Sequence, residues 1–66
     1  MNTWEERAKR AVIDRDMPLF LKVMEQLWHF EHKNYQESFE QVQAWTGIDR
    51  KTFDELNRLL EEQLSW

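Results

Sequence analysis

Few side chains in this 66-residue sequence have the types and spacing that chemistry requires. His29 and His32 lie three residues apart with Glu25 on the same polar helix face, and imidazole and carboxylate groups are metal ligands. The spacing indicates no fourth ligand, so we interpret this trio as a solvated helix face and expect neither a metal nor another cofactor. The sequence has no cysteine, which excludes a thiol nucleophile, a Cys-type zinc site and a disulfide.

Patterns typical of enzymes are lacking as well. The sequence has one glycine, Gly47, and contains neither a phosphate-binding glycine loop nor a nucleophile elbow. A chain of this length buries only about 60% of the surface that its unfolded form exposes, which leaves little room for a substrate pocket. We therefore expect a protein that is not an enzyme.

The elements that position the remaining polar groups are predicted to be helices. One Gly and one Pro leave little room for hairpin turns, and no segment alternates strictly between apolar and polar residues. We predict a single all-α domain over residues 1–66, a compact bundle of four short helices. Their expected ranges are 4–14, 17–33, 38–46 and 50–64.

Capping residues support these boundaries. Asp16 and Asp49 are good N-caps for the second and fourth helices. Ser38 and Gln41 have the spacing of a capping box at the start of the third helix, and Gly47 lies where that helix should stop in a positive-φ conformation.

The apolar residues predict which helix faces are buried. In the second helix they cover an arc of about 200°, wider than the stripe of roughly 100° on an ordinary surface helix. That helix is therefore either central or part of an interface; its apolar residues are Leu19, Phe20, Leu21, Val23, Met24, Leu27, Trp28 and Phe30. The fourth helix has a narrower stripe, formed by Phe53, Leu56, Leu59, Leu60 and Leu64.

The segment from about Met17 to Leu64 resembles a helix-turn-helix in a tri-helical arrangement. The residues that carry the resemblance are apolar or glycine at the family's spacing, namely Val42, Gly47, Ile48, Phe53 and Leu56. It resembles a winged helix that stops before its wing. The resemblance implies that Arg50, Lys51 and Thr52 begin a recognition helix and contact phosphates and base edges of DNA.

The sequence departs from that pattern at several positions. Gln43 stands where the family has a small residue, and Thr46 stands where an apolar residue is usual. The predicted fourth helix, counted with its N-cap, is acidic, with Asp49, Asp54, Glu55, Glu61 and Glu62 against Arg50, Lys51 and Arg58. The whole chain has a formal charge of −4, whereas nucleic-acid binders are typically basic.

The four tryptophans suggest another kind of partner. A core this small has difficulty burying four Trp and four Phe, and Trp is enriched at interfaces. We expect Trp28, Trp45 and Trp66 to bind a protein partner or a second copy of the chain. The sequence therefore favours a small accessory or regulatory protein that acts by protein–protein interaction, with sequence-specific DNA binding as the alternative.

The sequence also predicts a cytoplasmic protein without a membrane partner. No apolar run approaches the roughly 18–20 residues that a membrane helix needs. Glu5 and Glu6 lie where a signal peptide has basic residues, and no apolar region follows them.

Overall fold

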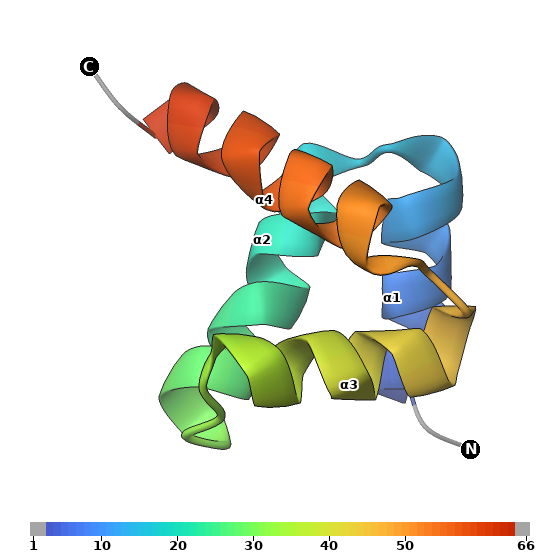
Figure 1. Cartoon of the computed structure of the whole chain (residues 1–66), viewed down its shortest axis with the longest axis vertical. Coiled ribbons are helices and arrows are strands. Elements are labelled where there is room, and N and C mark those ends of the chain that lie inside the picture. The colour runs from blue at the N-terminus through green and yellow to red at the C-terminus, as the bar shows by residue number, and fades with distance from the viewer. Residues whose placement is uncertain (1–2, 65–66) are drawn as a thin grey trace.

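A computed structural model describes residues 3–64, which form four α-helices and one π-helical segment. The helices are α1 (Thr3–Asp14), α2 (Met17–Glu25), α3 (Tyr35–Thr46) and α4 (Arg50–Leu64), and the π-helix η1 (Gln26–Phe30) continues α2. α1 and α2 pack side by side in opposite directions, α3 crosses one end of this pair, and α4 crosses the other end (Figure 1). Residues 3–64 contain no strand, and the all-α prediction is confirmed.

Side-chain caps start two of the helices at the predicted residues. Asp16 Oδ1 accepts a hydrogen bond from the Leu19 backbone N–H at 3.2 Å, and Pro18 occupies the first turn of α2, where no intrahelical donor is needed. Asp49 Oδ1 accepts from the Thr52 backbone N–H at 2.8 Å at the start of α4. These acceptors satisfy backbone donors that have no partner within the helix.

The third helix begins at Tyr35, earlier than the predicted residue 38. Asn34 Oδ1 accepts from the Glu37 N–H at 2.8 Å, and the Glu37 carboxylate accepts from the Asn34 N–H at 3.0 Å. This capping box takes the place of the one predicted at Ser38 and Gln41. Ser38 is instead buried inside α3, where its hydroxyl donates to the Asn34 carbonyl at 2.8 Å.

The second helix changes its geometry before the predicted end at residue 33. From Gln26 onward the turn is wider, and the Glu31 N–H reaches the Gln26 carbonyl at 3.0 Å, five residues back. The chain then leaves the helix through His32, which has φ of 56°. Side chains after Leu27 therefore do not follow the α-helical rotation that the apolar arc assumed.

The α3–α4 turn combines a left-handed glycine with two polar side chains. Gly47 has φ of 76°, as its position predicts. The Thr46 hydroxyl donates to the Val42 carbonyl at 2.8 Å and accepts from the Ile48 N–H at 3.2 Å. The Gln43 amide donates to the Ile48 carbonyl at 3.3 Å. The two departures from the sequence pattern, Gln43 and Thr46, thus satisfy backbone groups of the turn.

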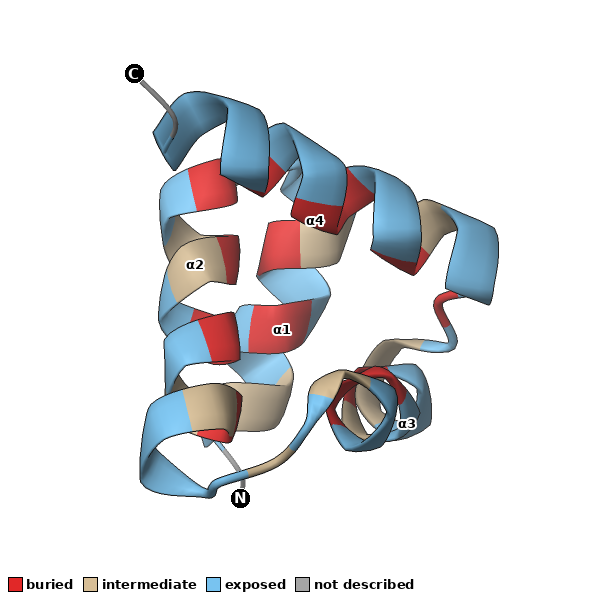
Figure 2. Cartoon of the chain, turned by 60° about the vertical axis from the view of Figure 1, so that its left-hand side comes forward, coloured by how far each residue is buried: buried red, intermediate tan, exposed pale blue. Residues whose placement is uncertain are grey.

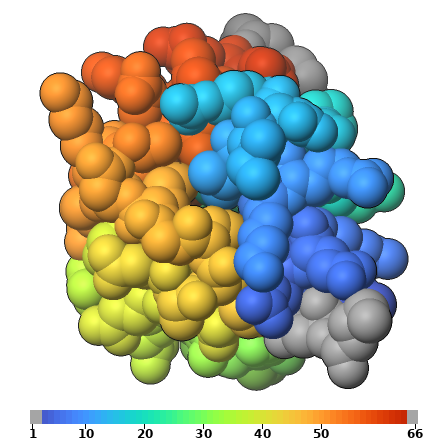
Figure 3. Space-filling view, turned by 90° about the vertical axis from the view of Figure 1, so that its right-hand side faces the viewer, coloured from blue at the N-terminus to red at the C-terminus, as the bar shows by residue number. Residues whose placement is uncertain are grey.

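The core lies between the two crossing helices and the α1–α2 pair, and buried residues face inward on all four α-helices (Figure 2). Figure 3 shows α1 packed directly against α3 on one side of the molecule. The core comprises Ala8, Ala11, Met17, Phe20, Val23, Met24, Leu27, Phe39, Val42, Ile48, Phe53, Leu56 and Leu60.

The predicted stripe of α4 is only partly buried. Leu59 and Leu64 are 41% and 46% exposed, while Asn57 is buried and donates to the Phe53 carbonyl at 2.9 Å. The buried arc is centred near Leu60, and Leu59 lies about 100° away from that residue. Every described residue after Leu60 is exposed, because the last turn of α4 extends past the core.

Phe53 is the aromatic centre of the fold. Its ring is fully buried and meets the rings of Phe20, Tyr35 and Phe39 edge-on, with centroid distances of 6.3, 5.2 and 5.4 Å. These rings come from α2 and α3, so Phe53 joins α4 to both helices. Edge-to-face contact is a favoured aromatic geometry and adds to the energy of apolar burial.

We expect Gly47→Ala to lower the free energy of unfolding by about 1 kcal/mol, since a left-handed residue with a Cβ is strained. A Cβ built at Gly47 meets no atom within 4 Å, so the loss reports backbone strain rather than a clash. Urea unfolding followed by tryptophan fluorescence measures the change. The control Gly47→Asn should lose less, because Asn tolerates this conformation. Equal stability of Gly47→Ala and the unmodified chain would contradict the assignment.

Candidate functional site

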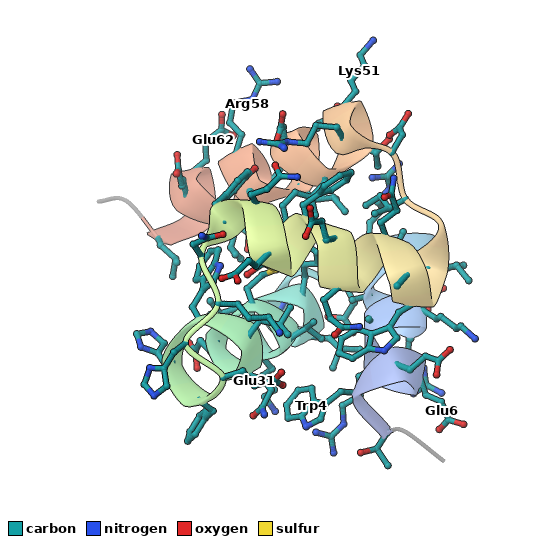
Figure 4. The ribbon with its side chains drawn as sticks, turned by 60° about the horizontal axis from the view of Figure 1, so that its bottom comes forward. Trp4, Glu6, Glu31, Lys51, Arg58 and Glu62 are labelled. Atoms are coloured by element: carbon teal, nitrogen blue, oxygen red, sulfur yellow. The ribbon has the colours of Figure 1, made fainter. Side chains whose placement is uncertain are left out.

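The three residues expected to contact DNA have different environments at the start of α4. Arg50 packs its guanidinium over two rings, with Cζ 5.2 Å from the centroids of both Tyr35 and Phe39. Lys51 is exposed and points away from the body of the molecule (Figure 4). Thr52 is half-buried, and its backbone N–H is used by the Asp49 cap. Lys51 therefore extends into solvent, whereas Arg50, with a side chain that is 47% exposed, is held against two rings.

Arg50 belongs to a polar network that joins the start of α3 to the start of α4. Its Nε donates to Asp54 Oδ1 at 3.0 Å, and its Nη1 donates to Gln36 Oε1 at 2.6 Å. The Tyr35 hydroxyl donates to the same Asp54 oxygen at 2.6 Å. These contacts hold the guanidinium over the aromatic cluster and use two of its five N–H donors, which limits the directions from which a DNA phosphate can be bound.

The network shifts the pKa values of two of its members. Burial of the ring and the hydrogen bond to the Asp54 carboxylate raise the pKa of Tyr35 to about 12. The hydrogen bonds from Tyr35 and Arg50 lower the pKa of Asp54, because both donors stabilise the carboxylate. At neutral pH the network therefore holds a neutral phenol, a carboxylate and a guanidinium.

The tryptophans expected to bind a partner expose only part of their surface to solvent. Trp28 and Trp45 are half-buried and pack against the hydrophobic core. Trp66 lies outside the described residues. Trp4, at the start of α1, also packs against the core, and the Arg7 guanidinium carbon lies 4.7 Å from its ring centroid. Each described Trp thus contributes part of its surface to the fold.

Other large apolar side chains have greater exposure. Ile13 is 77% exposed and Phe30 is 74% exposed, well above Leu59 and Leu64. The apolar pattern of the second helix predicts Phe30 within its buried arc, whereas no pattern in the sequence marks Ile13. The interruption of α2 explains Phe30, because the wider turn of η1 rotates the ring away from the stripe that ends at Leu27.

Phe30 lies at the end of the α1–α2 pair where α1 begins and η1 ends (Figure 1). Trp4 and Glu31 lie at this end of the molecule (Figure 4), and Trp28 belongs to η1 two residues before Phe30. We call Trp4, Trp28 and Phe30 the aromatic end. This end of the molecule therefore carries two half-buried indoles and one projecting phenyl ring.

The described part of the chain provides little for metal chemistry or membrane insertion. Among residues 3–64, no group of three or more His, Cys, Asp and Glu side chains is arranged to hold a metal ion, and this includes His29, His32 and Glu25. Within the same residues, no helix combines the length and the hydropathy needed to cross a bilayer. Every buried side-chain nitrogen or oxygen described has a hydrogen-bond partner.

Comparison of this chain with known protein families, curated proteins and solved structures finds no match in any of the three.

The Tyr35 network predicts a specific spectroscopic titration, because Tyr35 is the single tyrosine of the chain. We expect phenolate absorbance of the folded protein to rise with a midpoint near pH 12, against about 10 in denaturant. Because the pKa is higher in the folded state, the stabilisation is fully present below pH 10 and is lost as the pH rises through 12.

The matched variant for this titration is Asp54→Asn, which removes the carboxylate but keeps a hydrogen-bond acceptor. Its midpoint should move down toward 10 without reaching it, since the ring stays partly buried. A midpoint near 10 in the unmodified folded protein would show that the hydroxyl does not bind Asp54.

Proposed function

We propose that this protein is a small accessory or regulatory protein without enzymatic activity, and that it acts by binding a protein partner through the aromatic end. The observation that carries the proposal is the 74% exposure of the Phe30 ring. A large ring in water gains free energy when a partner's pocket covers it, and interface energy concentrates in such aromatic anchors.

The backbone at this position supports the same proposal. η1 turns Phe30 outward, although the apolar spacing of α2 would place it near the core, and π-helical segments occur frequently at functional sites. His32, two residues after the end of η1, adopts a left-handed conformation that is uncommon for residues other than glycine. Phe30 is thus the last residue of one departure from regular helix geometry and lies two residues before another.

The proposed partner has a concave apolar pocket with a basic rim. A phenyl ring requires an apolar pocket, and the formal charge of −4 on this chain favours a partner surface of opposite sign. Trp4 and Trp28 already pack against the core of this protein. Little side-chain entropy is therefore lost if their exposed edges contact the bound partner.

Replacing Phe30 with Ala tests the proposal. A photo-crosslinking residue at position 30 first identifies the partner in extracts, and calorimetry with the purified partner then measures affinity. We expect Phe30→Ala to weaken binding at least about tenfold, as expected for an aromatic anchor. Ile13→Ala is the matched control, because Ile13 is equally exposed but lies in the last turn of α1, away from the aromatic end. Equal affinities of the two variants would refute the proposed surface.

A second candidate function is DNA binding by a helix-turn-helix formed by α3 and α4. The observation that favours it is the burial of Val42, Ile48, Phe53 and Leu56 around a left-handed Gly47, which is the packing that such a motif requires. The involvement of Arg50 with Tyr35, Phe39 and Asp54 counts against it. Protein binding is therefore the function that we prefer.

An amide-resolved NMR titration with mixed-sequence duplex DNA at low salt distinguishes the two functions. DNA binding through α4 should shift the amides of residues 50–52, and Lys51→Ala should reduce both the affinity and its salt dependence. Lys22→Ala on α2 is the control for loss of an exposed positive charge. If the amides of residues 50–52 remain unshifted, α3 and α4 serve packing rather than DNA recognition.

A further inference from the structure

The outward face of α4 carries four charged residues in one line, which we call the α4 stripe. Its members are Lys51, Glu55, Arg58 and Glu62, all exposed and spaced at i, i+4, i+7 and i+11. At about 100° per residue they lie on the side of the helix opposite the buried residues. Figure 4 shows Lys51, Arg58 and Glu62 pointing away from the body of the molecule.

The signs of the α4 stripe alternate from positive at Lys51 to negative at Glu62. Read in reverse, the same four positions run from negative to positive. Two copies of α4 placed antiparallel, with the two-fold axis midway between Leu56 and Asn57, would therefore oppose unlike charges at every position. Lys51 would face Glu62 of the second copy, and Glu55 would face Arg58 of the second copy. A parallel pair in register would instead oppose like charges at all four positions.

Two further features of α4 fit this arrangement. Leu59 borders the α4 stripe and is 41% exposed. In the antiparallel pair the two copies of Leu59 would lie on the same side of the contact, about 7.5 Å apart along the helix axis. An open hollow on the surface of α4, lined by Lys51, Asp54, Glu55 and Arg58, provides room for side chains of the second copy.

We propose that two copies of this protein associate through the α4 stripe, antiparallel and about a two-fold axis. The contact is isologous, so each copy contributes both halves of each ion-pair type. It is weak and sensitive to salt, since exposed ion pairs contribute little and are screened at physiological ionic strength. The proposal goes beyond binding at the aromatic end, which uses other residues.

Complementary charge reversals test the proposed pairing. Lys51→Glu alone would oppose Glu to Glu62, and Glu62→Lys alone would oppose Lys to Lys51. An equimolar mixture of the two variants restores unlike charges at all four positions. Each variant puts an acid in the first turn or a base in the last turn of α4, which the helix dipole favours, but it also places like charges at one i, i+4 pair of the stripe. Far-UV circular dichroism of each variant therefore accompanies the measurement, to separate a lost contact from a weakened helix.

Sedimentation velocity at millimolar protein and low salt provides the measurement. We expect the unmodified chain to form a dimer that dissociates as salt rises, and each single variant to raise the dimer dissociation constant at least tenfold. The mixture should return it to within a factor of about three of the unmodified value. Lys22→Glu and Glu25→Lys are the charge-matched controls on the exposed face of α2, and both should dimerise normally alone and when mixed.

Three results would overturn the proposal. They are an unmodified chain that stays monomeric under these conditions, a dimer that survives both single variants, and single variants whose mixture does not recover. Phe30→Ala separates this proposal from the proposed function, because it should leave the dimer intact while it weakens binding of the protein partner. Loss of the dimer in Phe30→Ala would place self-association at the aromatic end and also overturn the α4 contact.

Discussion

The contact of the Phe53 ring with Phe20, Tyr35 and Phe39 is the interaction on which the second half of the structure depends. Its rings come from α2, α3 and α4, and they fix how α4 crosses α2. The polar network follows from it, since the same aromatic rings support Arg50 and bring the Tyr35 hydroxyl to Asp54. The direction in which α4 presents its outer face is therefore a result of aromatic packing.

Much of the fold follows from local residue patterns. Asp16, Asp49 and Gly47 mark helix ends because each satisfies a backbone requirement within a few residues of itself. The start of α3 was harder to predict, since two capping boxes overlap and only packing chooses between them; the earlier one allows Tyr35 to reach Phe53. The π-helical segment leaves no comparable local signal, because its residues would also suit a regular helix.

The candidate site was less predictable than the fold. The residue type of Arg50 suggests a phosphate contact, but its environment depends on residues of α3 that are distant in sequence. The tryptophans were expected at a surface because of their size, yet flat rings also cover the edge of a small core, as Trp28 and Trp45 do. Phe30 could not be identified in advance, since its exposure follows from the change in helical geometry.

The two-residue connection between α1 and α2 has a consequence for the order of folding. The antiparallel pair can form from neighbouring segments at a small entropic cost of loop closure. The contact between Phe20 and Phe53, in contrast, requires closure of a much longer stretch of chain. During synthesis from the N-terminus, the apolar face of α2 therefore emerges before α4 can cover it. In that interval α2 exposes to other molecules the surface that the finished protein keeps buried.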